Sequence, residues 1–194
     1  MTAVEVENAI EVESATADGA AIADPPADDA PARARRPLRD VLGRYATGVT
    51  VVTTRWQAGP AGLTVNSFTS LSLEPPLILW CLNRVSGSRA AFTAARHFAV
   101  NVLAADQYET ALGFAGPGDR FAGRAYRTGA HGLPVLERTV GTLICRRERI
   151  VPAGDHLVVI GEVLEYSAGP GAALLFVDGA YHAGPASCVR GSPD

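Results

Sequence analysis

Two long runs of strand-forming residues, separated by a short turn, set the strongest constraint on what this chain can fold into. The runs cover residues 140–151 and 156–167, and β-branched and other apolar residues dominate both. Pro152-Ala-Gly-Asp155 lies between them and supplies the residue types that tight turns prefer. This spacing and this turn chemistry predict a long antiparallel hairpin.

Shorter strands and helices are expected around this hairpin. The patterns predict further strands at 49–54, from Gly62 onward, at 77–83, at 98–103 and at 173–177. They predict three short helices, which begin near Pro37, Ser88 and Asp106. Six or seven strands and three helices without regular alternation argue against a doubly wound parallel sheet. A mainly β protein is predicted, as a closed antiparallel barrel with attached helices.

Local signals add details to this outline. The first helix should have one apolar face and end at Gly48. That face is formed by Leu38, Val41, Leu42 and Tyr45. Residues 57–62, with Gly59-Pro60, are predicted as a turn, and Pro75-Pro76 should stop any strand before them. Helices are predicted at 88–96 and 106–114, the second with Asp106 as its N-cap. The Gly- and Pro-rich segment 116–132 is predicted as loop.

The charge distribution separates a tail from a single folded domain. Residues 1–36 hold eight acidic residues, three arginines and no aromatic residue, a composition that predicts a disordered acidic, Ala/Pro-rich tail. We place the domain at 37–187 and a short disordered C-terminus at 188–194. The net charge of −3 therefore resides mostly in the tail, and the nearly neutral domain offers no basic field for nucleic acid.

The cysteines and the apolar runs bear on the compartment. Cys81, Cys145 and Cys188 form no C-x-x-C pair, so neither a disulfide framework nor a zinc site is expected. Cys81 and Cys145 lie in apolar runs and are expected to be buried thiols. The acidic N-terminus does not resemble a signal peptide, and no apolar run reaches the roughly 18 residues of a membrane span. We expect a cytoplasmic protein with no membrane contact.

The stretch Gly62–Pro76 is the first candidate binding segment. It carries hydroxyl and carboxamide side chains among apolar ones, with no charge before Glu74. Leu63 and Val65 should lie on one face of a strand, and Thr64 and Asn66 on the other. Neutral donors suit a flat ligand rich in carbonyls and ring nitrogens. An ordinary half-buried strand with its hydroxyls facing water explains the same pattern, and the residues alone favour that interpretation.

The polar loop at 84–89 is the second candidate segment. Ser86, Ser88 and Arg89 fall at the entrance of a predicted helix, where free N–H groups, hydroxyls and a guanidinium suit a phosphate. A serine-capped helix with solvated arginines explains the pattern equally well.

His156 is the third candidate, because it follows Gly154-Asp155 directly out of the predicted turn. A histidine that opens a strand beside a cleft can hydrogen-bond a carboxamide or move a proton near neutral pH. Taken alone, the pattern favours an ordinary surface histidine. The other three histidines have no metal-ligand spacing, and no nucleophile elbow or dinucleotide loop is present.

Several motifs in register resemble those of the short-chain flavin reductase family, the reductase components of two-component flavin-dependent monooxygenases. They are Arg44-Tyr-Ala-Thr-Gly-Val-Thr-Val-Val-Thr53, the Gly62–Pro76 stretch, Phe98-Ala-Val-Asn-Val-Leu103, Asp119-Arg-Phe121, Gly154-Asp-His156 and Leu174-Leu-Phe176. The resemblance covers about residues 38–184. It implies a split antiparallel β-barrel of the FMN-binding type, with Greek-key connections, usually as a homodimer.

The resemblance also implies roles for individual residues. Thr64, Val65, Asn66 and Ser67 would face the isoalloxazine ring and ribityl chain of FMN or FAD. The segment from Cys81 to Ser88, including Asn83, would follow the ribityl chain to the phosphate, with Ser86 and Ser88 at the phosphate and Arg89 as a weaker candidate. Phe121 would approach the flavin. His156 would be the catalytic residue that meets NADH or NADPH, and Tyr181 a weaker candidate for the same pocket.

The implied activity is hydride transfer from a nicotinamide to a flavin, followed by delivery of reduced flavin to a partner monooxygenase. The cofactors carry that chemistry, which accounts for the absence of a nucleophile or a strong acid–base pair. Two alternatives remain at this point. One is a flavin- or haem-binding module on the same barrel without reductase activity, and the other is an oxidase of the pyridoxamine-phosphate type. The flavin and nicotinamide preferences stay open.

Overall fold

The computed structural model describes residues 36–57 and 59–185. The predicted disordered segments 1–36 and 188–194 lie outside the described residues except for Arg36, which opens the first helix. The described residues contain three helices and a single 3-10 turn, η1, at Ala130–Gly132. The helices are α1 (Arg36–Gly43), α2 (Arg89–Ala94) and α3 (Tyr108–Ala115). The strands are β1 (Thr47–Gly48), β2 (Thr50–Trp56), β3 (Gly59–Val65), β4 (Thr69–Leu73), β5 (Pro76–Asn83), β6 (His97–Val102), β7 (Tyr126–Thr128), β8 (Pro134–Leu136), β9 (Gly141–Ala153), β10 (His156–Ala168), β11 (Leu174–Val177) and β12 (Ala180–Ala183).

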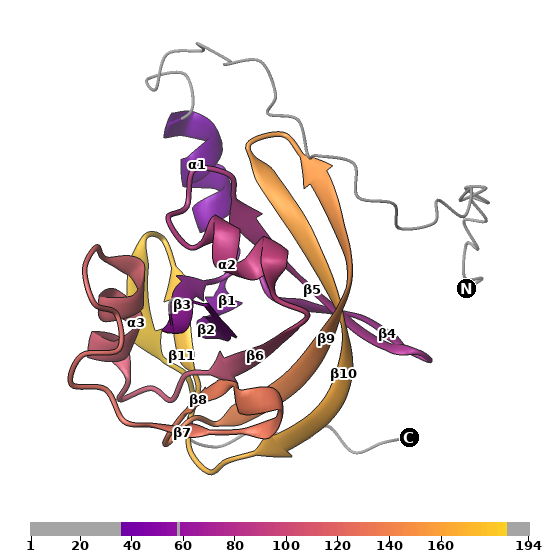
Figure 1. Ribbon diagram of the computed structural model, residues 1–194. Helices are drawn as coiled ribbons and strands as arrows, with labels where there is room; N and C mark the ends of the chain where they lie inside the picture. The colour runs from indigo at the N-terminus through magenta and orange to yellow at the C-terminus, as the bar shows by residue number, and fades with distance from the viewer. Residues whose placement is uncertain (1–35, 58, 186–194) are drawn as a thin grey trace, which may run out of the picture.

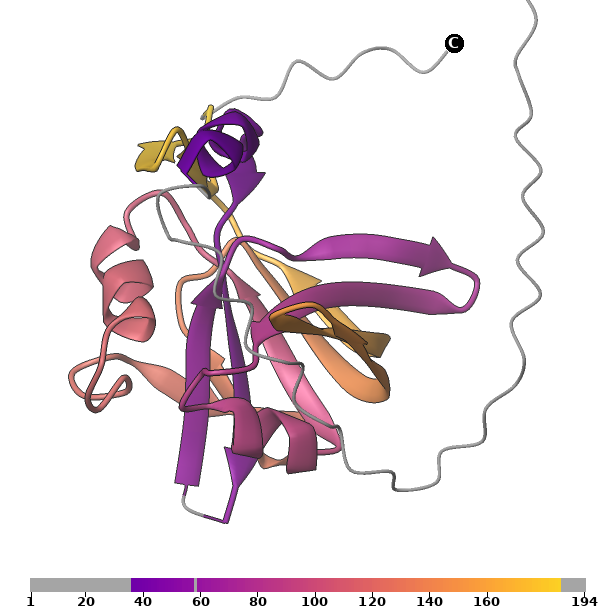
Figure 2. The same ribbon diagram turned by 90° about the horizontal axis from the view of Figure 1, so that it is seen from above.

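One seven-stranded antiparallel sheet, in the order β3-β2-β6-β9-β10-β5-β4, forms most of the molecule (Figure 1). The sheet curls around its core, while the β4–β5 hairpin projects away from the rest in both views (Figures 1 and 2). β3 and β4 are its two edge strands, and they do not pair with each other. The barrel is therefore split between them, and the predicted fold class is confirmed.

The predicted long hairpin is present as β9 and β10. Ala153 pairs with His156, so Gly154 and Asp155 form a two-residue turn. Gly154 has φ +57, a conformation that glycine adopts without the steric cost of a side chain. His156 consequently occupies the first position of β10, where it pairs with Asn83 at the end of β5.

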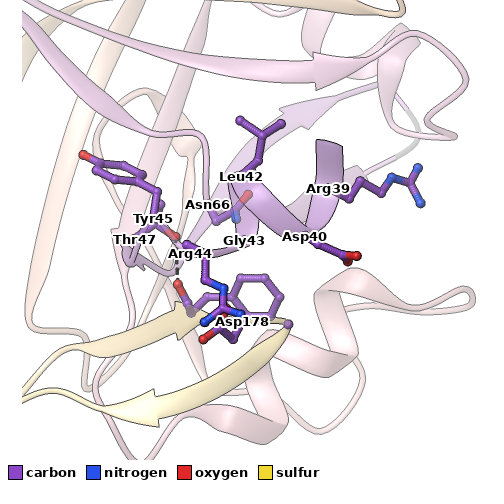
Figure 3. Close-up of a pocket in the computed structure, with 11 residues that line it drawn as sticks. Arg39, Asp40, Leu42, Gly43, Arg44, Tyr45, Thr47, Asn66 and Asp178 are labelled. Atoms are coloured by element: carbon purple, nitrogen blue, oxygen red, sulfur yellow. Dashed lines mark hydrogen bonds and ion pairs between the residues drawn. The ribbon is translucent and has the colours of Figure 1, made fainter. Parts of the chain in front are cut away.

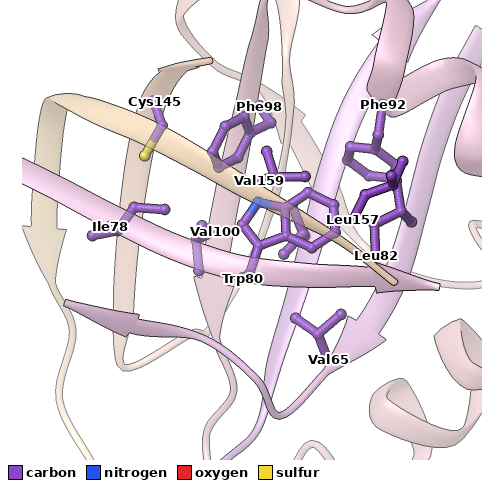
Figure 4. Packing of buried hydrophobic residues seen from close by; sticks show 11 residues of the cluster. Val65, Ile78, Trp80, Leu82, Phe92, Phe98, Val100, Cys145, Leu157 and Val159 are labelled. Carbon is purple, nitrogen blue, oxygen red and sulfur yellow. The ribbon is translucent and has the colours of Figure 1, made fainter. Parts of the chain in front are cut away.

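The main core fills the inside of the curled sheet (Figure 4). Trp80 on β5 is fully buried, and its ring meets the edges of Phe92 on α2 and Phe98 on β6. Burying each side chain of this size contributes about 1.5–3 kcal/mol to folding. The core thus clamps α2 against the barrel and fixes the loop that precedes α2.

A second core joins α3 to the small sheet β1-β11-β12. Phe114 of α3 is fully buried and packs in this cluster with Leu103 and Leu174. The bridge between Ala104 and Ala173 links the two sheets at this point. α3 therefore lies against β3, which places the loop after α3 beside the start of that strand.

The first helix is shorter than predicted. α1 ends at Gly43, and Gly48 instead belongs to β1, where it pairs with Leu175 of β11. The predicted apolar face is present but open to solvent: Leu38, Val41, Leu42 and Tyr45 are 61%, 69%, 63% and 77% exposed. In the single chain, this face packs on no core.

The turn predicted at 57–62 was wrong for Gly59 and Pro60. These two residues belong to β3 and pair with Trp56 and Arg55, because a strand at the edge of a sheet tolerates a residue without a donor. β4 ends at Leu73, before Pro75-Pro76, as predicted, and Pro76 opens β5, where it pairs with Leu73.

Three further predictions were wrong around α3 and β5. Asp106 is not the N-cap of α3: it pairs with Arg138, and the N-cap position is held by Gln107, whose Oε1 accepts a hydrogen bond from the Ala104 N–H. The predicted loop 116–132 contains β7 and η1. Cys145 is buried, and burial raises the pKa of its thiol to about 12, but Cys81 is only half-buried.

The helix at 88–96 is also shorter, covering only Arg89–Ala94. The described residues form twelve strands rather than six or seven, because β1, β7, β8 and β12 are too short to leave a periodic signal and β4 was not separated from the strand that begins at Gly62. No helix of the described residues is long and apolar enough to cross a membrane.

Candidate functional site

The end of β3 places its polar residues at the open edge of the barrel. Asn66 is exposed, and its side chain makes no hydrogen bond to another described residue. Thr64 donates its hydroxyl to the Ala111 carbonyl of α3 at 2.7 Å, so this hydroxyl fixes the strand to the helix. Val65 is buried in the main core, and its carbonyl accepts a hydrogen bond from Thr50. Asn66 is thus the polar side chain that this segment leaves available.

Ser67 bridges the split in the barrel. Its hydroxyl oxygen accepts a hydrogen bond of 2.9 Å from the Cys81 N–H of β5. β5 is paired with β4 only as far as Leu79, so Cys81 lies where the outer edge of β5 has become free. The free edge of β3 and the free end of β5 are therefore held side by side, with a side-chain bond in place of a backbone ladder.

The loop after β5 is ordered by its own polar groups. The Asn83 Oδ1 accepts from the Val85 N–H at 2.9 Å, and the Ser86 hydroxyl accepts from the Ser88 N–H at 3.3 Å. Arg89 lies at the start of α2, where its Nη1 donates to the Arg84 carbonyl. Ser88 makes no side-chain cap to the helix. Its hydroxyl is instead held from the other side of the site.

Arg120 holds that hydroxyl. Its Nη1 donates to Ser88 Oγ at 2.9 Å and to the Gly62 carbonyl of β3 at 2.8 Å, while Nε donates to the Gly116 carbonyl at 2.9 Å. A pocket of about 540 Å³ opens here, lined by Gly62, Ser88, Arg120 and Phe121 among others. The Phe121 ring packs edge-on against Phe114 and Tyr126, so it braces the pocket from the core side.

His156 lies at the other side of the β5 end. Its Nδ1 is 2.7 Å from the Asp155 carboxylate, which orients the imidazole, and its side chain is 39% exposed. The backbone register sets it opposite Asn83. A half-exposed, oriented imidazole beside a polar strand end can donate a hydrogen bond to a ligand amide.

Tyr181 lies apart from His156, on the small sheet. Its ring meets the edges of Phe176 and Tyr108, and burial together with Tyr108 raises the pKa of its hydroxyl. It lines a pocket of about 170 Å³ with Thr64, Asn66 and Phe176. The structure thus brings Tyr181 together with the β3 residues, and His156 together with the β5 residues.

A larger pocket of about 840 Å³ adjoins the Asn66 side (Figure 3). α1 forms one wall, and Thr47, Asn66 and Phe176 lie across from it. The Arg44 guanidinium, 3.2 Å from the Asp178 carboxylate, ties the end of α1 to the turn between β11 and β12. Both pockets at Asn66 have Asn66 and Phe176 in their walls, so they adjoin each other, and together they are called the hollow at Asn66.

One strand connects the two ends of the site. Gly62 lines the pocket with Ser88 and Arg120, and Asn66 lines the hollow at α1. Asn66 follows Gly62 by four positions, which corresponds to about 13 Å along an extended strand. The strand between them carries no charged side chain, while the hollow at α1 has two basic and two acidic residues in its wall, Arg39, Arg44, Asp40 and Asp178. A narrow elongated ligand that is anionic at the Ser88 end matches this arrangement. Fold and site together define the class of split-barrel proteins that bind flavin nucleotides.

The chain belongs to the flavin reductase like domain family, whose model matches residues 42–185. It is 42% identical to an FMN reductase (NADH) from Agrobacterium fabrum over 146 residues, covering 75% of this chain and 84% of that protein. It is 40% identical to the reductase component of a 4-nitrophenol 4-monooxygenase/4-nitrocatechol 2-monooxygenase from Rhodococcus opacus, over 74% of this chain and 78% of that one. The predicted family membership is confirmed.

A solved structure extends the likeness to the whole fold. The NADH:FAD oxidoreductase of Streptomyces globisporus C-1027, in complex with NAD and FAD fragments, superposes with a TM-score of 0.74 at 37% identity. The match covers 84% of this chain and 95% of that one.

Sequence reasoning missed three contributors to the site. Arg120 belongs to the Asp-Arg-Phe motif that drew attention to Phe121, but the sequence analysis gave it no role of its own. Phe176 belongs to the Leu-Leu-Phe motif and lines both pockets at Asn66. Gly62 leaves no room for a side chain, because a Cβ there would meet Phe114 at 2.7 Å. Only the tertiary contacts distinguish these residues from ordinary core or surface positions.

Proposed function

We propose that this chain is an NADH-dependent flavin reductase that delivers reduced flavin to a partner monooxygenase. The observation that carries the proposal is the uncharged edge of β3, which joins an anion-suited pocket at Ser88 to an open hollow at Asn66. When both are bound, nicotinamide and flavin supply the hydride chemistry themselves. The chain has to hold the nicotinamide ring and the flavin ring in contact and then release the reduced flavin.

The residues fit a flavin nucleotide on a physical test. Arg120 is a half-buried cation with no ion-pair partner among the described residues, which suits a phosphate. The ring-side segment, by contrast, offers neutral groups only: Asn66 with the backbone of Thr64, Val65 and Ser67. Neutral groups hydrogen-bond a flavin ring without favouring one charge state so strongly that the ligand is trapped.

We assign His156 to the nicotinamide. The carboxylate of Asp155 at Nδ1 directs the other ring nitrogen, Nε2, away from the turn. Nε2 can then hydrogen-bond the carboxamide and hold the nicotinamide ring over the flavin position. Cys81 and Asn83 line the approach between the two, and Tyr181 supports the hollow from the small sheet.

We further propose that the active form is a homodimer. Leu38, Val41 and Leu42 of α1 and Tyr45 just after it form an exposed apolar face, and Leu42 and Tyr45 of this face line the hollow at Asn66. A second copy that covers this face would bury it and close the hollow.

Cys81 and Cys145 are free thiols, which supports a reducing compartment such as the cytoplasm.

The test is NADH oxidation, followed by the loss of nicotinamide absorbance, with and without added FMN or FAD. We expect turnover that depends on flavin and transfers reducing equivalents to oxygen in the absence of a partner. An NADH signal that stays constant with either flavin, while flavin fluorescence is quenched on binding, would instead identify a binding module without reductase activity.

A further inference from the structure

We propose that residues 4–13 of this chain dock as an added strand in a groove beside β4. The groove shares no lining residue with the pockets at Ser88 and Asn66, so the inference does not depend on the proposed function. Three observations carry it. They are an unpaired sheet edge, an apolar groove next to that edge, and a run of alternating residues that matches both. The groove is called the β4 groove below.

β4 is an edge strand whose outer side pairs with no strand in the described part of the chain. It ends the sheet and pairs with β5 alone, and the hairpin of the two projects from the barrel (Figure 2). Its sequence, Thr-Ser-Leu-Ser-Leu, carries no charge, and Leu71 and Leu73 are exposed. At the other edge, by contrast, Thr64 donates to α3 and Arg120 binds the Gly62 carbonyl. Proteins usually cover or charge an edge such as β4, because it can pair with any extended chain.

The β4 groove has a volume of about 420 Å³ and combines apolar with charged side chains. Arg146 forms ion pairs with both Glu148 and Glu162. Arg149 is exposed, and its guanidinium makes no hydrogen bond or ion pair with another described residue. The groove therefore suits an apolar segment that carries a carboxylate for Arg149. Its apolar lining residues are Leu71, Pro75, Leu77 and Ile160.

The run at residues 4–13 has that chemistry. β-Branched residues alternate there with glutamates, and only Asn8 and Ala9 interrupt the pattern. A period of two places the apolar residues on one face of a strand and the acids on the other. The composition of residues 1–36 predicts disorder for that segment on its own, and a free sheet edge supplies the partner that such a segment needs in order to fold. The alternating residues are Val4, Val6, Ile10 and Val12 on one face, and Glu5, Glu7, Glu11 and Glu13 on the other.

The chain is long enough to bring this run to β4. Residues 14–35 connect it to α1, and an extended stretch of that length reaches up to about 70 Å. A domain of this size is only about 40 Å wide. Pairing with β4 would satisfy the backbone of both strands, the valine and isoleucine face would cover Leu71 and Leu77, and a glutamate would pair with Arg149.

Hydrogen–deuterium exchange of the Thr69–Leu73 amides in the full chain tests this docking. Val6→Asn with Ile10→Asn removes half of the apolar face and keeps the charge and the length of the segment. The β4 amides should then exchange at least about 10-fold faster than in wild type, because two apolar side chains no longer hold the added strand. Ile22→Asn is the matched control, since Ile22 lies in the same segment but outside the alternating run. It should leave the exchange of β4 unchanged, as should all variants for the buried strand β2.

The charge contact is tested by Arg149→Gln. This variant should speed the exchange of β4 about 2- to 5-fold, the effect of one exposed ion pair, and 0.5 M sodium chloride should remove the difference from wild type. Arg127→Gln is the control, because Arg127 is an exposed arginine that does not line the β4 groove. An equal effect of the two arginine variants would contradict a specific contact at Arg149.

Two results would overturn the proposal as a whole. One is exchange of β4 in wild type that is as fast as in the double variant at Val6 and Ile10, which would mean that the segment does not protect the edge. The other is slow exchange that survives the double variant but is lost on dilution, which would assign the edge to a second copy of the folded domain. Neither result involves flavin, so the proposed function would stand or fall separately.

Discussion

The two ends of the site differ in how complete they are within one chain. At the end that we propose for the flavin phosphate, formed by Gly62, Ser86, Ser88 and Arg120 and called the phosphate end, the three side chains are fixed by hydrogen bonds to loop and strand. At the ring end, which we define as Asn66, Thr47 and Phe176 with the facing wall of α1, Asn66 has no hydrogen bond to a described residue and α1 exposes its apolar face. A single chain therefore prepares the binding of the anion, and a second copy would complete the cover of the ring.

The largest expected effect comes from a side chain at Gly62, where β3 lies close to the ring of Phe114 on α3. A Cβ at Gly62 would meet the Phe114 ring at 2.7 Å and Thr53 at 3.3 Å, inside a close-packed core. Gly62→Val should lower the free energy of unfolding by about 1–3 kcal/mol or more through overpacking. It should also weaken flavin binding, because β3 must shift. Urea unfolding and flavin titration measure the two effects.

Gly87→Ala is the matched control for that substitution. Gly87 lines the same pocket, but a Cβ there would meet nothing within 4 Å. Its stability should remain within about 1 kcal/mol of wild type. If Gly62→Val were as stable as Gly87→Ala, the close contact of β3 with α3 would not be the feature that fixes the site.

The next largest effect tests whether the ring end needs a second copy. Leu38→Gln with Val41→Gln removes apolar side chains that are 61% and 69% exposed in the single chain. If a partner buries them, each contributes roughly 1.5–3 kcal/mol, so the dimer Kd should rise at least about 100-fold. Sedimentation measures the dimer, and FMN binding should weaken in parallel.

Leu112→Gln is the control for this pair, because Leu112 is an exposed apolar residue on α3 rather than α1. It should leave the sedimentation behaviour unchanged. A double variant at Leu38 and Val41 that sediments like wild type would show that the α1 face is not the contact between copies.

A smaller, ligand-specific effect is expected at His156. Its replacement removes one hydrogen bond to the nicotinamide and leaves both ends of the flavin site intact. His156→Ala should raise the KM for NADH about 5- to 20-fold, the loss expected for one hydrogen bond, and change the KM for flavin less. Steady-state kinetics with His182→Ala as the control histidine measures it. A larger rise in the flavin KM would reverse the assignment.

Features set by local sequence could be predicted, whereas contacts between distant segments could not. The β9–β10 hairpin and the buried β5 follow from periodicity and turn chemistry, which are local signals, whereas the Thr64–Ser67 segment was singled out only by the family resemblance. Arg120 could not be found this way, since its partners Gly62 and Ser88 lie 58 and 32 residues away. The short β1 and β12 were missed because tertiary pairing, not propensity, makes them strands.

The smallest expected effect lies outside the site, at the stacked imidazoles of His97 and His131. Their ring centroids are 3.9 Å apart and nearly parallel. Burial, His131, Arg96 and Arg146, in that order, lower the pKa of His97 below its ordinary value of 6.5. The unfolded chain therefore binds a proton more readily than the folded one. The free energy of unfolding should be constant above that value and fall as pH drops from 6.5 through the lower folded pKa.

Urea unfolding across this pH range measures the effect, and two variants assign it. His97→Gln should flatten the acid slope, because the residue that gains a proton on unfolding is gone. His131→Gln removes only one of the causes, so His97 should keep part of its shift and the slope should fall less. An acid slope in His97→Gln as steep as in wild type would place the proton uptake at another group. Flavin affinity at neutral pH should be equal in all three proteins, since neither histidine borders the phosphate end or the ring end.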